Sequence, residues 1–262
     1  MAKKETLRKT SARKTKPNAK QHPTQNAAVH TWRICPYGEH WVTAHPLHIP
    51  PSLRHPEGSV VSRRGHCAKN PSGKDQLYPD EIREISNQHF SNLRNKTCPL
   101  PLEFPNGSKY DDLIAGWVLY WNEVLHPSDP LDPNLVKALI ATESGFNPNV
   151  LANKKKLNSA RGLMQITNVT RKILGDESGE LKDHFITATR ADLNDPSVNI
   201  CAGVRWLFQK RKLASLRLKH PATWIKAISE YKGASTTSKK RAKELMDKFN
   251  KRYEALTKCG KQ

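Results

Sequence analysis

The amino-acid sequence predicts a mainly α fold, preceded by a small loop-rich or β-containing module. Apolar residues recur at helical spacing in segment after segment from about residue 77 onward. Residues 30–78, by contrast, are dense in His, Pro, Gly and Arg, and no helical period persists there for more than one turn. With 262 residues, 36% of them hydrophobic, the chain has enough apolar side chains for the core of one ordinary domain.

The first segment, residues 1–28, has the composition of a disordered basic tail. It contains eight Lys and Arg residues and one Glu, a net charge of +7, and it has no apolar run. No hydrophobic segment follows the charged start, and no stretch of the chain approaches eighteen consecutive apolar residues. We therefore expect a protein made in the cytoplasm without a signal peptide and without a transmembrane helix.

Residues 29–78 are the predicted small module, in which HWVTA and GSVVSRR are possible strands. Its candidate zinc ligands are Cys35, His40, His45, His66 and Cys67. No CxxC pair is present, and neighbouring His66 and Cys67 would strain a tetrahedral site. Two alternatives stay open: a structural zinc ion, or a metal-free basic module packed through its aromatic residues. We expect no other cofactor.

The five cysteines are expected to be reduced. Their number is odd and their spacing irregular, at Cys35, Cys67, Cys98, Cys201 and Cys259. Without a signal peptide, a framework of disulfides is not expected.

Residues 79–109 are predicted to form a helix and a proline-rich linker. The segment LYPDEIREISNQHFSNL, residues 77–93, is typical of a helix capped at Asp80, and CPLPLEFPNG follows it. A second helix is expected in KYDDLIAGWVLYWNEVLH. Its apolar side would carry Leu113, Ile114, Trp117 and Trp121.

The later helices have clear start signals. In LDPNLVKALIAT, Asp132 can cap the helix and Pro133 fits its first turn. DPSVNICAGVRWLFQKR begins in the same way at Asp195, and PATWIKAISEY repeats that start. Residues 236–262 are predicted to be a basic helix. The ten Lys and Arg residues and three acids of residues 232–262 give this end a net charge of +7.

Glu143 ends one of these helices in the segment ATESGF, just before the left-handed stop that Gly145 offers. A carboxylate in the last turn faces the negative end of the helix dipole, and Leu139 and Ile140 beside it reduce its hydration. Both effects favour the protonated acid, which is a useful general acid near neutral pH. The alternative is an exposed glutamate at a frayed helix end.

Four motifs then occur in order. Glu143-Ser144-Gly145 is followed by SARGLMQI at residues 159–166, by NICAG at residues 199–203 and by Glu230-Tyr231. In order and approximate spacing they resemble the catalytic domain of the soluble lytic transglycosylases, over residues 110–235. The resemblance implies a lysozyme-like fold and a peptidoglycan substrate.

The resemblance also implies roles for residues. Glu143 matches the catalytic glutamate, which protonates the oxygen of the β-1,4 bond between N-acetylmuramic acid and N-acetylglucosamine. It then acts as a base while the muramoyl 6-hydroxyl closes a 1,6-anhydro ring, so no second carboxylate is required. The residues expected to line the substrate site are Ser144, Gly162, Met164, Gln165 and Tyr231. Among these, Gln165 is expected to hydrogen-bond to the glycan or to Glu143, and the Tyr231 hydroxyl to contact Glu143, whereas Asn199 and Gly203 are expected to be structural.

The sequence departs from the family at Lys232, where the motif has asparagine, and at Glu230, a second carboxylate in the neighbourhood. Lys232 is expected to contact a peptide-stem carboxylate or to be solvated, and Glu230 to pair with it. This departure keeps a hydrolase (muramidase) outcome open.

A formal charge of +20 suits an anionic wall polymer. It also suits an alternative of another class, a protein that binds nucleic acid or another polyanion on a lysozyme-like scaffold. As a wall enzyme the chain would act in the cell wall or periplasm. A phage particle, membrane lesions and a secretion apparatus are equally open as routes. The N-terminal module would bind glycan or a larger assembly.

Overall fold

The computed structural model describes residues 32–53, 56–91, 93, 97–153, 155–156, 158–181 and 183–259. The predicted basic tail, residues 1–28, lies outside them. Six short strands are described: β1 (Glu39–Val42), β2 (His45–Ile49), β3 (Ser59–Arg63), β4 (His66–Lys69), β5 (Gln76–Leu77) and β6 (Phe185–Ile186). The α-helices are α1 (Pro79–His89), α2 (Asp111–Leu125), α3 (Pro133–Glu143), α4 (Asn168–Leu174), α5 (Pro196–Leu218), α6 (Trp224–Tyr231) and α7 (Lys239–Lys258), with 3-10 turns η1 (Asp192–Asn194) and η2 (Ala234–Thr236).

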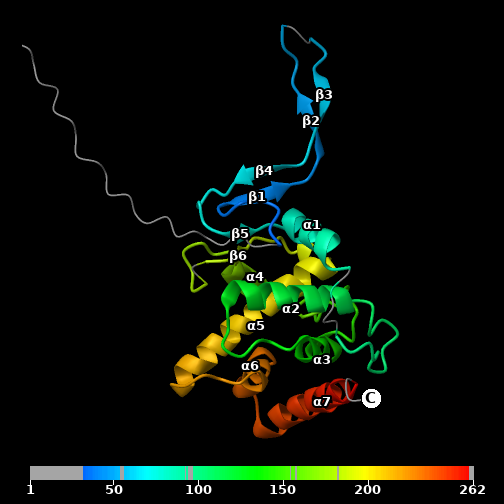
Figure 1. Cartoon of the computed structure of the whole chain (residues 1–262), viewed down its shortest axis with the longest axis vertical. Coiled ribbons are helices and arrows are strands. Elements are labelled where there is room, and N and C mark those ends of the chain that lie inside the picture. The colour runs from blue at the N-terminus through cyan, green and yellow to red at the C-terminus, as the bar shows by residue number, and fades with distance from the viewer. Residues whose placement is uncertain are drawn as a thin grey trace, which may run out of the picture.

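The expectation of a mainly α domain preceded by a small β module is confirmed. β1 pairs with β4 and β2 with β3, both antiparallel, and the two strands expected in HWVTA and GSVVSRR correspond to β1 and β3. The β2–β3 ribbon extends from one end of the molecule, while the helices form its body (Figure 1). Across the described residues, none of the helices combines the length and the apolar character that crossing a membrane requires.

Ion pairs and a short parallel strand pair join the β module to the helices. Arg33 is nearly buried and pairs with Asp75 and with Glu81 of α1. β5, which follows the module, pairs in parallel with β6, more than a hundred residues later. Because these charges are buried, each needs its partner, and the pairs fix the module against α1.

The expectation of reduced cysteines is wrong. Cys35 is joined to Cys67 and Cys98 to Cys259, while Cys201 is a free thiol buried in α5. The paired residues are 32 and 161 positions apart. Spacing along the chain gave no sign of these pairs, because folding alone brings the paired segments together.

The helical core forms around α2 and α5. Trp117, Tyr120 and Trp121 of α2 are buried, as the apolar side of this helix predicts. Trp117 Nε1 donates to Ser197 Oγ at 2.9 Å and Trp121 Nε1 donates to the Cys201 carbonyl at 3.0 Å. Both indole N–H groups therefore have partners inside the core, and α2 lies along the first half of α5.

Two of the predicted helix starts need correction. α1 begins at Pro79 after Tyr78, which makes no side-chain cap, and Asp80 lies in the first turn paired with Arg83. α6 is capped by the Thr223 hydroxyl, so its start does not repeat that of α5. The caps expected at Asp132 and Asp195 are confirmed, since each accepts a backbone N–H of its helix.

The basic C-terminal helix is present as α7, at the end of the molecule opposite the β2–β3 ribbon (Figure 1). Phe249 and Leu256 are buried, and Tyr253 donates to Asp132 at the start of α3 at 3.0 Å. The disulfide of Cys259 ties α7 to the proline-rich segment. That segment packs against the helices through Phe104, whose ring meets Phe146.

Candidate active site

Glu143 is held at the C-terminal end of α3. Asp132 caps the other end, and Gly145 has a φ of +58°, which ends the helix as expected. A side chain at Gly145 would also collide with Phe104, because an added Cβ would lie 2.9 Å from that ring. The backbone that follows Glu143 is therefore fixed by the proline-rich segment.

The Glu143 side chain is partly exposed, at 19%, and its closest partner is a lysine. Lys232 Nζ donates to Glu143 Oε1 at 2.6 Å and to Thr142 Oγ1 at 2.9 Å. Its own side chain is only 3% exposed. The expectations that Lys232 is solvated and that it pairs with Glu230 are therefore wrong. The Glu143 carboxyl therefore has a fixed cationic partner at the end of α3.

Glu230 is engaged elsewhere. Its carboxylate pairs with Arg217 at 2.7 Å and Lys226 at 3.2 Å, and it accepts from Ser235 at 2.8 Å. Burial raises the pKa of this carboxyl, but the hydrogen bonds from Arg217, Ser235 and Lys226 outweigh it and lower the pKa to about 2. Glu230 is thus ionised at neutral pH and cannot serve as a general acid.

Three acids that follow the GLMQ turn in the chain, Asp176, Glu177 and Asp183, also have their own surroundings. Asp176 Oδ1 accepts from Ser178 within its own loop, at 3.0 Å. Glu177 follows it in the same loop, and its carbonyl accepts from Lys74 of the N-terminal module at 3.0 Å. The Asp183 carbonyl accepts from Arg205 of α5 at 3.3 Å. None of these contacts involves Glu143.

The GLMQ turn is organised by a buried asparagine. Asn199 Oδ1 accepts from Met164 N at 2.7 Å, and its Nδ2 donates to the carbonyls of Arg161 and Leu193 at 3.1 and 2.8 Å. Gly203 faces the Met164 side chain, where an added Cβ would lie 2.3 Å from the sulfur. Both residues are structural, as expected.

Within this turn, Gly162 and Met164 differ from what the resemblance implies. Gly162 has a φ of +76°, and an added Cβ would lie 2.1 Å from Asn199 Nδ2, so the glycine is needed by the protein's own packing. Met164 is fully buried. Its side chain belongs to the core, and a substrate contact of that side chain is not supported.

The expected contact of the Tyr231 hydroxyl with Glu143 needs correction, and Gln165 donates hydrogen bonds to the turn itself. Gln165 Nε2 donates to the carbonyls of Gly162 and Val150 at 2.8 and 3.2 Å. The Tyr231 hydroxyl donates to the Met164 carbonyl at 2.7 Å. Burial raises the pKa of Tyr231 well above its usual value, and the nearby Glu143 charge adds to this effect. Tyr231 is therefore a neutral group that links α6 to the turn.

Ser144 directly follows α3. Its hydroxyl donates to the Ile140 carbonyl at 3.3 Å, and the side chain is partly exposed. It lies beside Glu143 in the chain, as the motif requires, and its hydroxyl is engaged by its own helix.

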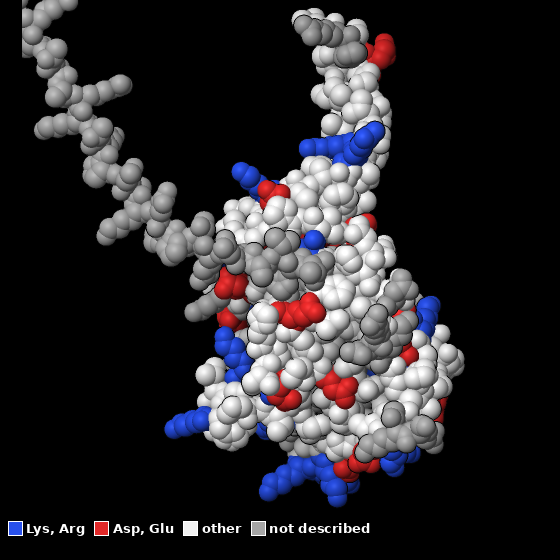
Figure 2. Space-filling view, in the orientation of Figure 1, with Lys and Arg blue, Asp and Glu red and all other residues white. Residues whose placement is uncertain are grey.

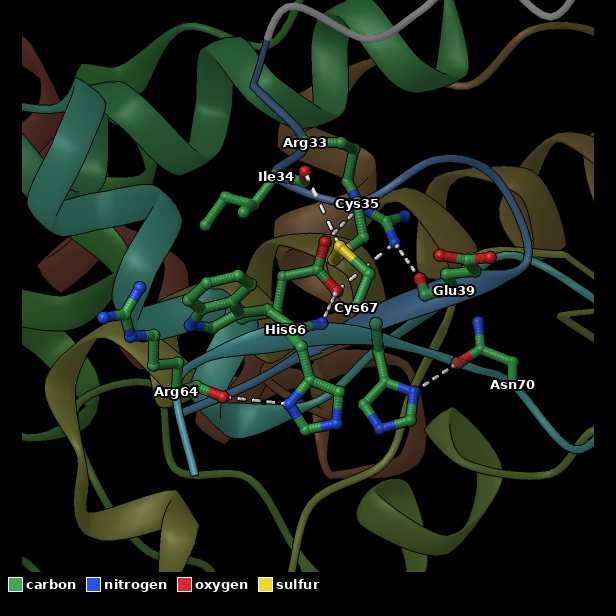
Figure 3. Close-up of a disulfide and its surroundings, with 11 residues drawn as sticks. Arg33, Ile34, Cys35, Glu39, Arg64, His66, Cys67 and Asn70 are labelled. Carbon is green, nitrogen blue, oxygen red and sulfur yellow. Dashed lines mark hydrogen bonds and ion pairs between the residues drawn. A yellow bond between two sulfur atoms is a disulfide. The ribbon is translucent and has the colours of Figure 1, made fainter. Parts of the chain in front are cut away.

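The candidate zinc ligands do not converge. Cys35 and Cys67 form a disulfide, which removes both thiolates (Figure 3). The histidines have separate partners: His40 bonds to Asn70 at 2.8 Å, His45 to the Thr43 carbonyl at 3.0 Å and His66 to the Arg64 carbonyl at 3.1 Å. Among the residues that the structure describes, no group of three or more His, Cys, Asp or Glu is placed to hold a metal ion.

The site therefore offers one partly exposed carboxyl group at a rigid helix end, a buried cation against it, and a turn held by internal hydrogen bonds. Such a carboxyl can donate a proton to a bound oxygen and take one back. The hydrogen bond from Lys232 to Glu143 is the contact of this site that residue patterns did not predict. Its signal was present, however, because a lysine stands where the related motif has asparagine.

Comparison with known proteins finds a family match for part of the chain. Residues 126–254 match the family described as the transglycosylase SLT domain. Among solved structures, the chain is similar to the 70 kDa soluble lytic transglycosylase of Escherichia coli, with 19% sequence identity and a TM-score of 0.30. That likeness covers 55% of this chain and 21% of the Escherichia coli chain, so this chain spans about a fifth of that protein. No curated protein matches it.

Proposed function

We propose that residues 126–254, which match the transglycosylase SLT domain family, make this chain a peptidoglycan lytic transglycosylase. The substrate bond is the β-1,4 linkage between N-acetylmuramic acid and N-acetylglucosamine. The product is a glycan strand that ends in a 1,6-anhydromuramoyl residue.

In the proposed reaction Glu143 acts twice. As an acid it gives its proton to the glycosidic oxygen, and the bond from that oxygen to the muramoyl C1 breaks. As a base the resulting carboxylate takes the proton of the muramoyl 6-hydroxyl, whose oxygen bonds to C1. Glu143 ends protonated as it began. No water is consumed and no cofactor is required.

The observation that carries the proposal is the position of Glu143. It lies inside the matched family domain, at a fixed helix end, with a partly exposed carboxyl group. Glu230 is committed to Arg217 and Lys226. A mechanism that needs one carboxylate fits this site better than hydrolysis, in which a second carboxylate usually activates water.

We propose that Ser144 and Gln165 line the substrate site. The other three residues support the site without contacting the glycan. Gly162 and Met164 shape the turn, and Tyr231 ties the turn to α6. This assignment keeps all five residues at the site and gives direct contact with the glycan to Ser144 and Gln165, which are partly exposed, because the hydroxyl of the also partly exposed Tyr231 is engaged by Met164.

We also propose that the chain acts in the cell wall or periplasm. Two disulfides between distant segments suit an oxidising compartment, and peptidoglycan lies in such a compartment. The formal charge of +20 favours approach to a polymer rich in carboxylates. The N-terminal module, with its protruding β2–β3 ribbon, is the part available to bind glycan or a larger assembly.

The test is mass spectrometry of soluble products from purified peptidoglycan, digested with wild type and with Glu143→Gln. We expect muropeptides lacking one water with wild type and none with the variant, which is matched to wild type in size. Asp176→Gln, in a loop with its own contacts, should digest like wild type. Products with reducing ends would identify a muramidase. If the folded wild type releases no soluble products, polyanion binding becomes the favoured function.

A further inference from the structure

The ribbon formed by β2 and β3 leaves apolar side chains in solvent. Its two antiparallel strands pair over five residues each, with Leu47 opposite Val61 at the centre. The ribbon projects away from the helices (Figure 1). Its exposed apolar side chains are Leu47 at 40%, Ile49 at 37%, Val60 at 61% and Val61 at 42%. Apolar surface gathered on a projecting element is typical of a binding surface.

The two edges of this ribbon differ. β2 contains Pro46, which has no N–H, and Pro50 and Pro51 follow directly after the strand. Prolines of this kind blunt an edge against further pairing. β3 reads Ser-Val-Val-Ser-Arg, without proline, and among the described residues it has no strand on its other side. β3 is therefore the open edge, where backbone groups can hydrogen-bond to another extended chain.

The ribbon is held at both of its ends. At the base, β4 follows β3 after two residues and contains Cys67, whose disulfide to Cys35 fixes it (Figure 3). At the far end, Gly58 has a φ of +70°, and an added Cβ would lie 2.7 Å from the Ile49 carbonyl oxygen. An edge that is already ordered loses little conformational entropy when a partner binds.

The end of β3 nearest the body is basic. Arg63 ends the strand, Arg64 follows it, and both residues are exposed. Lys and Arg side chains are visible at the base of the ribbon (Figure 2). A segment that pairs with β3 would therefore be stabilised by carboxylates opposite the two arginines and by β-branched side chains opposite Val60 and Val61.

Other occupants fit this edge less well. An open sheet edge is not tolerated in lipid hydrocarbon, where its backbone groups would have no partners. A second copy would bring another charge of +20. One pair of short strands also buries far less than the roughly 1,000 Å² that a stable interface between folded proteins needs. A sugar strand has hydroxyl groups but no row of peptide N–H and C=O groups to match a strand.

We propose that β3 is a docking edge for an extended acidic segment of a partner protein. The segment adds a third strand to the ribbon and places its carboxylates against Arg63 and Arg64. Such a contact would hold the chain in a larger assembly. The inference goes beyond the proposed function, because pairing with β3 does not require cleavage by Glu143.

The probe is the synthetic peptide Glu-Glu-Thr-Val-Val-Thr with blocked ends, whose acids lie opposite the two arginines in antiparallel register. Lys-Lys-Thr-Val-Val-Thr reverses its charge. A third peptide keeps the acidic sequence but has N-methyl groups on both valines, which removes backbone donors. Calorimetry with the full chain gives the Kd, and hydrogen–deuterium exchange locates the bound peptide.

Two charge variants of the chain complete the design. Arg63→Glu/Arg64→Glu reverses the basic end of the edge. Lys248→Glu/Lys251→Glu is the matched control, because it makes the same change in net charge at exposed positions of α7.

We expect wild type to bind the acidic peptide about tenfold or more tightly than the lysine peptide and the N-methylated peptide. Exchange of the β3 amides should slow. In Arg63→Glu/Arg64→Glu the preference should reverse in favour of the lysine peptide. Lys248→Glu/Lys251→Glu should keep the wild-type preference.

Several results would overturn the proposal. The acidic peptide could fail to bind, or bind without slowing exchange in β3, which would place it elsewhere on this basic chain. Equal binding of the N-methylated peptide would exclude strand pairing. Slower β3 exchange with soluble muropeptides but with none of the peptides would identify glycan as the occupant. A dimer in analytical ultracentrifugation with β3 protected would identify a second copy. If the chain releases no peptidoglycan fragments, the proposed function fails, yet the expected peptide binding stays the same.

Discussion

Gly162 lies in the GLMQ turn, and its backbone has a φ of +76°. A β-carbon there would lie 2.1 Å from Asn199 Nδ2 and 2.4 Å from the Leu193 carbonyl oxygen. Asn199 is itself fully buried and holds Met164 N. A methyl group at position 162 would thus push against the residue that organises the turn.

We therefore expect Gly162→Ala to lower the free energy of unfolding by about 2–5 kcal/mol, from left-handed strain and overpacking together. Gly73→Ala is the matched control, because Gly73 has a φ of +65° with no atom within 4 Å of an added Cβ. It should lose only about 1–2 kcal/mol, the strain alone. Urea unfolding of both variants measures the difference. Equal losses would show that crowding around Asn199 has no effect.

At the same scale, the sequence predicted that Glu143 ends a helix, because the signals for that position are local. A cap, an apolar stripe and a glycine stop all lie within the segment that forms α3. It did not predict what Tyr231 or Gln165 contacts, because those partners are set by how α6 and the turn meet in space. The GLMQ pattern predicted a structured turn at residues 162–165. Most of the hydrogen bonds of that turn stabilise the turn itself.

At the scale of elements, the helices with an Asp cap followed by Pro were predicted well, and elements fixed by distant partners were not. α3 and α5 begin where Asp132 and Asp195 indicate. α7 could be predicted as a helix from its spacing, but its disulfide to Cys98 could not, because the two cysteines are 161 positions apart. This disulfide brings α7 and the proline-rich segment together beside α3.

This arrangement predicts what loss of the Cys98–Cys259 disulfide does. Closing so long a loop restricts the unfolded chain, so Cys98→Ser/Cys259→Ser should lower the free energy of unfolding by about 3–5 kcal/mol. Trypsin should then cut the Lys- and Arg-rich α7 faster than it does in wild type, as followed by mass spectrometry. Cys35→Ser/Cys67→Ser is the control and should leave α7 protected. If α7 resists trypsin equally in both variants, packing on α3 holds it without the disulfide.

At the scale of the whole molecule, the basic surface lies apart from the proposed catalytic carboxyl of Glu143. Lys and Arg side chains project from the end of the molecule that carries α7 (Figure 2). Glu143 instead ends α3, where its nearest cation is buried. The surface charge can therefore bring the chain to an anionic polymer without taking part in bond cleavage.

Such a division predicts strongly salt-dependent binding. Because exposed charges are screened within about 10 Å at 0.1 M salt and less at higher salt, cosedimentation with peptidoglycan should fall roughly tenfold between about 50 and 500 mM NaCl. Glu143→Gln is the suitable form for this measurement, since it should bind without digesting the polymer. Chitin particles, a neutral glycan, should show little salt dependence. Binding to peptidoglycan that does not change with salt would mean that contacts at the site, and not the charge of +20, bring the chain to its substrate.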